Sequence, residues 1–419
     1  MNAPRISKRL APKLQGPASP PAEPDLKRAL SRVMKMMAIP GPSGHEAKIV
    51  QFIVDELRRA GAPAKAIKTD SAHKRSRIGG DVGNLILKLP GTRPGPGPGT
   101  GSGARRLLMA HVDTVPLCVG CKPVQRRRIV RSADRNTALG ADNRSGAAAV
   151  LTGAVEILRQ RLPHPPVTFL FPVQEEIGLA GVPHASLTDL GKPAMGFNFD
   201  GGMPHQVVVA ATGAYRITFE VQGIASHAGV HPEDGASAIA IAALAIAQLQ
   251  RDGWHGLIRK GSQTGTSNVG LVEGGSAVNV VAPTATVRAE ARSHDPRFRK
   301  RILDTMVKAF AQAAQSVRGQ DGRCGKVNVS SSLDYESFKL GPREPCVAVA
   351  ENVIRGLGLE PIRVVVNGGL DANVTSQRGI PTVTLGAGQH HPHTVDELLN
   401  VKEFENGCRL ALRLASMEF

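Results

Sequence analysis

In LLMAHVDTV, residues 107–115, the apolar run 107–110 is followed by His111 and Asp113. Such a run predicts a short buried strand whose polar residues lie at its carboxyl end. Four more segments place an acidic residue or a histidine just past a short apolar run: ALGADNRSG (138–146, Asp142), FLFPVQEEIG (169–178, Glu175 and Glu176), GFNFDGG (196–202, Asp200) and TLGAGQHHPHTVDE (384–397, His393). Carboxylates and imidazoles are common metal ligands, so this repeated pattern predicts a site for two metal ions.

Two of these segments also have simpler interpretations when each is taken alone. His111 and Asp113 are two residues apart and therefore share one face of a strand, so Asp113 can hold one imidazole nitrogen and leave the other for metal. They could equally end a surface strand. Asp142 precedes a predicted helix at 145–161, where its carboxylate could bridge two cations or simply cap the helix.

The adjacent Glu175 and Glu176 face opposite ways in an extended chain. One carboxylate could bind metal while the other acts as a general base toward water. A solvated acidic turn is the alternative, but the apolar strand before the pair and IGLAG after it do not favour this. Asp200 is followed by two glycines, which allow close approach of the backbone. His390 and His391 compete with His393, and spacing does not choose between them.

Composition sets the class of protein. The chain has 419 residues, 41% hydrophobic and 3% aromatic, and a net charge of +17. The basic residues are scattered and lack interleaved aromatics, so we expect no nucleic-acid partner. The most apolar stretch, residues 236–249, is shorter than the ~20 residues of a membrane helix, so no membrane partner is expected. Cys118 and Cys121 form a lone C-x-x-C that reads as two ordinary thiols, and we expect a cytoplasmic protein.

Strands alternating with helices predict an α/β sheet whose functional residues lie at the carboxyl ends of the strands. The pattern changes near residue 211, where strands and helices follow the β-α-β-β-α-β order of a ferredoxin-like unit. The expected organisation is a disordered tail (1–24), a catalytic domain in two parts (25–210 and 336–419) and an inserted lid or dimerisation domain (211–335).

The motifs HVDT, LGADN, QEEIG, FDGG, SHAG, GGLDAN and HTVDE occur in an order that resembles the di-zinc metallopeptidase family of peptidase T (tripeptidase), carboxypeptidase G and aminoacylase. The resemblance covers residues 26–415 and is greatest to members like peptidase T. It implies a zinc-dependent exopeptidase-like mixed-sheet domain interrupted by a ferredoxin-like (βαββαβ) lid.

The resemblance also implies roles for residues. One zinc takes His111, Asp142 and Asp200, and the other takes Asp142, Glu176 and His393, so that Asp142 bridges. Glu175 is the general base and Asp113 orients His111. A cis peptide follows the bridging aspartate, at Asp142-Asn143. In the lid, His227 stabilises the oxyanion in a neighbouring active site, while Asn279, Arg292 and Gly369 contact substrate.

The function implied is hydrolysis of short peptides from a free N-terminus, by a metal-bridged water and a glutamate base. Two Zn²⁺ per subunit are expected, with Co²⁺ or Mn²⁺ as alternatives, in a homodimer formed through the lid. Asp200 favours an aminopeptidase, because deacylases and carboxypeptidases of the family tend to have Glu there. Asn367, where peptidase T has Arg, leaves an N-acyl amino-acid deacylase or a carboxypeptidase as the alternative.

Overall fold

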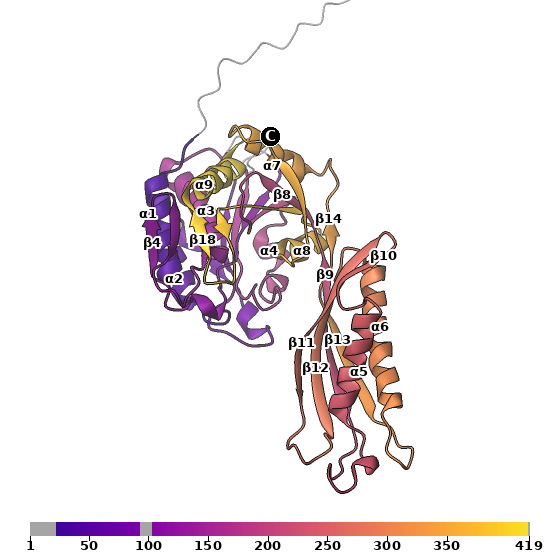
Figure 1. Ribbon diagram of the computed structural model, residues 1–419. Helices are drawn as coiled ribbons and strands as arrows, with labels where there is room; N and C mark the ends of the chain where they lie inside the picture. The colour runs from indigo at the N-terminus through magenta and orange to yellow at the C-terminus, as the bar shows by residue number, and fades with distance from the viewer. Residues whose placement is uncertain (1–21, 93–102, 418–419) are drawn as a thin grey trace, which may run out of the picture.

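The computed structural model describes residues 22–92 and 103–417. It has a larger lobe and an elongated lid lobe, which comprises residues 213–335 and projects from one side of the larger lobe (Figure 1). The predicted tail falls almost entirely outside the described residues, as does most of the Gly/Pro-rich segment before Arg105. None of the helices in the described part of the chain is long and apolar enough to cross a membrane.

The larger lobe is built on one mixed sheet with the strand order β1-β2-β6-β3-β7-β16-β8-β14, and β15 pairs with β8 outside this path. Its strands are β1 (Ile67–Thr69), β2 (Leu85–Leu89), β3 (Arg106–Met109), β6 (Val167–Phe171), β7 (Met195–Phe199), β8 (Gln206–Ala211), β14 (Phe338–Lys339), β15 (Ile362–Val366) and β16 (Thr382–Leu385). The four central strands β6, β3, β7 and β16 run parallel. A smaller sheet has the order β17-β18-β5-β4 and consists of β4 (Pro123–Arg126), β5 (Ile129–Ser132), β17 (Gln389–His390) and β18 (Leu398–Asn400).

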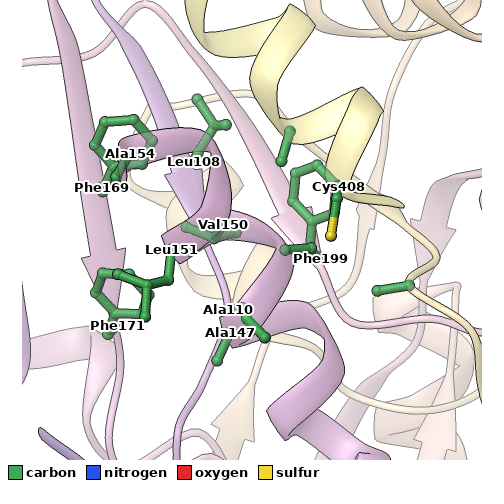
Figure 2. Close-up of a cluster of buried hydrophobic side chains, with 14 of the residues drawn as sticks. Leu108, Ala110, Ala147, Val150, Leu151, Ala154, Phe169, Phe171, Phe199 and Cys408 are labelled. Atoms are coloured by element: carbon green, nitrogen blue, oxygen red, sulfur yellow. The ribbon is translucent and has the colours of Figure 1, made fainter. Parts of the chain in front are cut away.

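Helices cover both faces of the large sheet, which explains why its central strands are continuously apolar. The larger lobe contains α1 (Leu26–Ala38), α2 (Ala47–Arg59), α3 (Ala141–Gln160), α4 (Leu187–Leu190), α7 (Pro345–Arg355), α8 (Asp371–Gln377) and α9 (Val401–Ser416). On one face, Leu108, Phe169 and Phe199 pack against Ala147 and Leu151 of α3 (Figure 2). Alternate residues such as Leu107 and Leu170 point to the other face, toward α4. This core fixes the strand ends from which the site is built.

The lid lobe is a five-stranded antiparallel sheet, ordered β10-β11-β12-β9-β13, with two helices on one face. Its elements are β9 (Gly213–Gln222), α5 (Ala238–Arg251), β10 (Gly256–Lys260), β11 (Gln263–Gly274), β12 (Thr284–Ser293), α6 (Pro296–Ser316) and β13 (Lys326–Tyr335). Apolar residues alternate along β9, so that Phe219 stacks on Phe310 of α6 with ring centroids 3.9 Å apart. The predicted fold class is confirmed. Edge strand β10 adds one strand to the βαββαβ order.

Two adjacent connections join the lobes. β8 leads into β9, β13 leads into β14, and Phe338 of β14 pairs with Ala211 of β8. Arg299 of α6 braces this junction: its guanidinium pairs with Glu336 and donates to the carbonyl of Ser293 at 3.3 Å. We propose residues 211–335 as the limits of the inserted domain.

Candidate metal centre

The polar residues of the five segments meet at the carboxyl edge of the parallel strands. His111 follows β3, Glu175 and Glu176 follow β6, and Asp200 follows β7. Asp142 joins them from the non-helical start of α3, and His393 from the loop after β17. These six side chains and Gly369 line one cavity of about 290 Å³. The convergence follows from parallel pairing, which brings the strand ends to one edge of the sheet.

The Asp142 carboxylate lies between two histidines. Its Oδ1 is 3.3 Å from Nε2 of His111, and its Oδ2 is 3.4 Å from Nε2 of His393. His393 Nε2 also lies 2.8 Å from Oε2 of Glu176. Each oxygen of Asp142 therefore faces a different imidazole, which is the arrangement that a carboxylate bridging two cations requires.

Asp200 and Glu175 both approach His111. Oδ1 of Asp200 lies 3.7 Å, and Oε2 of Glu175 lies 4.0 Å, from its Nε2. Two groups of three residues offer ligand atoms within 4.8 Å of one another: His111, Asp142 and Glu176; and His111, Glu175 and Asp200. These groups overlap with the two expected ligand sets but differ in membership, because Glu175 lies as close to the cluster as the expected ligands do.

Asp113 holds several residues of the metal centre in place. It is fully buried, and Oδ1 lies 3.3 Å from Nδ1 of His111. The same carboxylate accepts hydrogen bonds from the backbone N–H groups of Glu175 (3.0 Å) and Glu176 (3.1 Å) and from the Ser43 hydroxyl (2.7 Å). One side chain thus fixes both a histidine and the turn that carries the two glutamates.

Glu397 holds the loop that carries Asp142, a positioning role that the sequence pattern did not reveal. Its carboxylate accepts from the N–H groups of Gly140 at 2.6 Å and Asp142 at 2.8 Å. Gly140 has φ 75°, a conformation in which glycine carries no penalty. The Asp142-Asn143 peptide is cis, as the resemblance implied. The Asn143 side chain donates to the Phe199 carbonyl at 2.8 Å and so ties this loop to the end of β7.

Glu46 is a second positioning residue that the sequence did not reveal. It is buried and accepts from the N–H groups of Gly44 (2.9 Å) and Gln174 (3.1 Å), the residue before Glu175. Burial raises its pKa to about 7. Asp371, at the start of α8, is also buried. Burial raises its pKa to about 8, and the negative charges of Asp200 and Asp113 contribute to this shift. Both carboxyls therefore keep their protons to a higher pH than ordinary carboxyls do.

The cluster has an excess of carboxylates. Burial lowers the pKa of His111, but Glu175, Asp113, Asp142 and Asp200 together raise it well above its ordinary value. Hydrogen bonds with Asp142 and Glu176 raise the pKa of His393 to about 10. Burial raises the pKa of Glu175 well above its ordinary value. The shifts of the two histidines reflect surrounding carboxylates that favour positive charge, whereas the shift of Glu175 reflects burial, which disfavours its charged form.

The donor set fits metal ions. Oδ1 of Asp142 and Oε1 of Glu176 are buried and have no hydrogen-bond partner among the described residues. Buried carboxylate oxygens without a partner are costly unless a cation compensates them. His390 instead pairs with Glu403 through Nε2, so the geometry favours His393 among the three neighbouring histidines.

The lid residues lie apart from this cluster. Strand β9 runs ten residues away from the junction, so the loop with His227 lies roughly 33 Å along the strand from it. Val280 and His227 pair in an isolated β-bridge, so Asn279, the residue before Val280, lies at the same far end of the lid lobe. Arg292 is near the junction, opposite Ala214, and both its Nε and Nη2 donate to Glu290 at 2.9 Å.

The chain is similar to known peptidases over most of its length. The peptidase dimerisation domain of the M20 family matches residues 209–318. Uncharacterized protein YqjE of Bacillus subtilis is 30% identical over 389 residues, which cover 93% of this chain and 97% of that protein. A tripeptidase structure from Staphylococcus aureus is 29% identical with a TM-score of 0.82, covering 94% of this chain and 99% of its own.

An aminopeptidase PepT structure from Bacillus cereus is also 29% identical, with a TM-score of 0.78, and covers 94% of this chain and 98% of its own. These likenesses span the larger lobe and the lid together, and they accompany a cluster of metal-ligand residues in which one aspartate separates two histidines. The chain therefore belongs to the M20 family of metallopeptidases.

Proposed function

We propose that the protein is an aminopeptidase that hydrolyses short peptides and binds two zinc ions per subunit. The observation that carries this proposal is the placement of Asp142, whose two oxygens lie 3.3 and 3.4 Å from two different histidines. The similarity to a tripeptidase and to PepT supports a peptide substrate. Five free cysteines, among the described residues, agree with a reducing compartment such as the cytoplasm.

His111, Asp142 and Asp200 would hold one ion, and Asp142, Glu176 and His393 the other. When bound, two such cations polarise the scissile carbonyl and make water acidic enough to react near neutral pH. Asp113 keeps His111 and the backbone of Glu175 in place throughout. Among the carboxylates that line the cavity, this division leaves Glu175 without a ligand role.

Glu175 acts as the general base. It accepts a proton from the attacking water and later gives this proton to the amine that leaves when the C–N bond breaks. Its raised pKa, caused chiefly by burial, suits a group that must both take up and release a proton. Asp200 faces the same cavity, and its family counterpart is associated with substrates that have a free N-terminus.

The preference for a free N-terminus separates the proposal from its alternative. The zinc-loaded protein should hydrolyse a free tripeptide, and it should lose at least about tenfold in kcat/KM on the N-acetylated form of the same peptide. A deacylase or carboxypeptidase would show the opposite order. A chelator should abolish turnover, and added Zn²⁺, Co²⁺ or Mn²⁺ should restore it to different extents that identify the effective metal.

We also propose a homodimer formed through the lid, in which His227 of each copy stabilises the oxyanion in the other copy's site. The far position of His227 and the dimerisation-domain match support this. Glu175→Ala and His227→Ala variants, each inactive alone, should regain about a quarter of wild-type activity when mixed, because each mixed dimer has one intact site. No recovery in dimers shown to exchange subunits would contradict a contribution from the second copy.

A further inference from the structure

A second cavity, of about 620 Å³, lies between the lid sheet and the turn after β6 that carries Glu175 and Glu176, which we call the catalytic turn. Glu176 lines this cavity and also the metal centre, so the two spaces adjoin. Three arginines line it: Arg77 from the larger lobe, and Arg216 and Arg288 from the lid sheet. A substrate that reaches the metal centre therefore has a basic cleft beside it.

The cleft uses the lid face that α5 and α6 leave uncovered. Val287 and Ala289 pack under the helices, so the alternate residue Arg288 points to the opposite face. In Figure 1 this face is turned toward the larger lobe. A Cβ built on Gly178, in the catalytic turn, would lie 3.7 Å from Asp334 of the lid. The lid sheet and the catalytic turn are thus neighbours.

Most charges in the cleft are already paired. Glu290 accepts two hydrogen bonds from Arg292. Arg216 pairs with Asp334, its Nε lying 3.0 Å from Oδ2. Within the described ranges, Arg77 and Arg288 have no carboxylate partner. The cleft therefore retains two uncompensated guanidinium groups, one contributed by each lobe.

Arg77 is tied to the catalytic turn. Its Nη2 donates to the carbonyl of Ile177 at 2.7 Å, and Ile177 directly follows Glu176. Arg288 is held in the central lid strand β12, opposite Thr218 of β9. One cation is thus attached to the turn of the metal centre and the other to the lid, and both line the same cavity.

We propose that this cleft is a subsite for a carboxylate of the substrate, and that Arg77 and Arg288 give the enzyme a preference for peptides that carry an acidic residue. This inference rests on the proposed peptidase function. A guanidinium matches a carboxylate in two parallel hydrogen bonds, and pairs of this kind discriminate against neutral isosteres. The carboxylate that the cleft binds is that of an Asp or Glu side chain of the peptide.

The test compares tripeptides in which Glu or Gln occupies each position in turn of an alanine background, each with a free or an amidated C-terminus. We expect one position at which Glu exceeds Gln by about tenfold in kcat/KM, as one charge-assisted contact would give. The amidated forms separate an effect of the terminal carboxylate from an effect of the side chain. Equal values for every Glu/Gln pair in the active wild-type enzyme overturn the proposal, whether or not amidation lowers kcat/KM.

Charge-reversal variants test whether Arg77 and Arg288 cause this preference. Arg288→Glu and Arg77→Glu should each favour Lys over Glu at the selected position. Arg259→Glu, an equal charge change on the exposed lid strand β10 away from the cleft, should keep the wild-type order. A preference that survives in both cleft variants, or that falls equally in the control, overturns the assignment. If one variant fails to fold, the other, from the opposite lobe, carries the test.

Binding provides a readout that does not need turnover. The zinc-loaded Glu175→Gln variant is titrated calorimetrically with the Glu and Gln peptides, with and without Arg288→Glu. Tighter binding of the Glu peptide that Arg288→Glu removes supports the subsite, and equal binding overturns it. Failure of the wild-type enzyme to cleave any peptide counts against the proposed function alone, since the titration still decides the inference.

Discussion

Replacement of Glu397 by Gln tests how far the metal centre depends on a residue that is not itself one of the expected ligands. The wild-type carboxylate, 1% exposed, accepts from the N–H groups of Gly140 and Asp142 at 2.6 and 2.8 Å. Glutamine keeps one acceptor, but its amide N–H₂ must face the other N–H. The variant therefore loses one hydrogen bond outright, and the bond that remains is no longer charge-assisted.

The expected cost follows from these contacts. A hydrogen bond to a charged group contributes about 1.5–3 kcal/mol, and a buried donor left without a partner costs a similar amount. We expect the free energy of unfolding to fall by about 2–4 kcal/mol. Because the loop that moves carries Asp142, the affinity for the metal ions should fall by about 10–100-fold, as is typical for residues that hold a ligand in place.

Two measurements check this prediction. Both are made at pH 8, because burial raises the pKa of Glu397 to about 7 and its carboxylate is charged above that pH. Competition with a chromophoric chelator gives the metal affinity, and urea unfolding of the metal-free protein gives stability. Glu405→Gln is the control, since it removes one solvent-exposed pair with Arg128 at 3.1 Å and should cost at most about 1 kcal/mol. Glu397→Gln with the affinity and stability of the control would refute the reasoning.

Three further predictions concern single residues. Glu175→Ala should lower kcat by about 10³-fold with the metal content measured by atomic emission unchanged, and retained turnover would contradict its role as base. Burial raises the pKa of Glu46 from 4.5 to about 7, so the folded state binds this proton more tightly than the unfolded chain. The stability of the metal-free protein should therefore decline by up to about 3 kcal/mol as the pH rises from about 4.5 to 7, and urea unfolding at pH 5 and 8 should show a smaller decline for Glu46→Gln. Gly146→Ala should destabilise by about 3 kcal/mol, because its Cβ would lie 1.9 Å from the Phe199 carbonyl oxygen, whereas Gly341→Ala, with nothing within 4 Å, should change the thermal midpoint little.

The sequence predicted the parts of the fold that repeat a local pattern. The apolar run before His111 and the run before Asp200 are strands β3 and β7, and their parallel pairing explains why distant segments meet. The lid was anticipated as βαββαβ, but β10 was missed. Its five residues are mostly exposed at the sheet edge, so they lack the apolar alternation that marks a strand.

Positioning contacts were harder to anticipate than ligands. Glu397 and Glu46 act by accepting backbone N–H groups of loops far away in sequence, and such contacts leave no periodic signal. The pairing of Arg292 with Glu290 also depends on which lid face is exposed. The family resemblance could suggest Arg292 as a substrate contact, but it could not show that a neighbouring carboxylate already binds the guanidinium.

The two strands that flank the lid, β8 and β14, pair with each other, and this pairing affects the order in which the chain folds. Ala211 and Phe338 are neighbours in the large sheet although about 125 residues separate them. If the segment between them were unfolded, closing that loop would cost roughly 3 kcal/mol more than closing one of four residues. Once the lid has folded, Ala214 lies opposite Tyr335, so the remaining gap is that of a short hairpin. Folding of the inserted unit thus turns the most distant pairing of the large sheet into a local one, which favours a lid that forms before β14 joins β8.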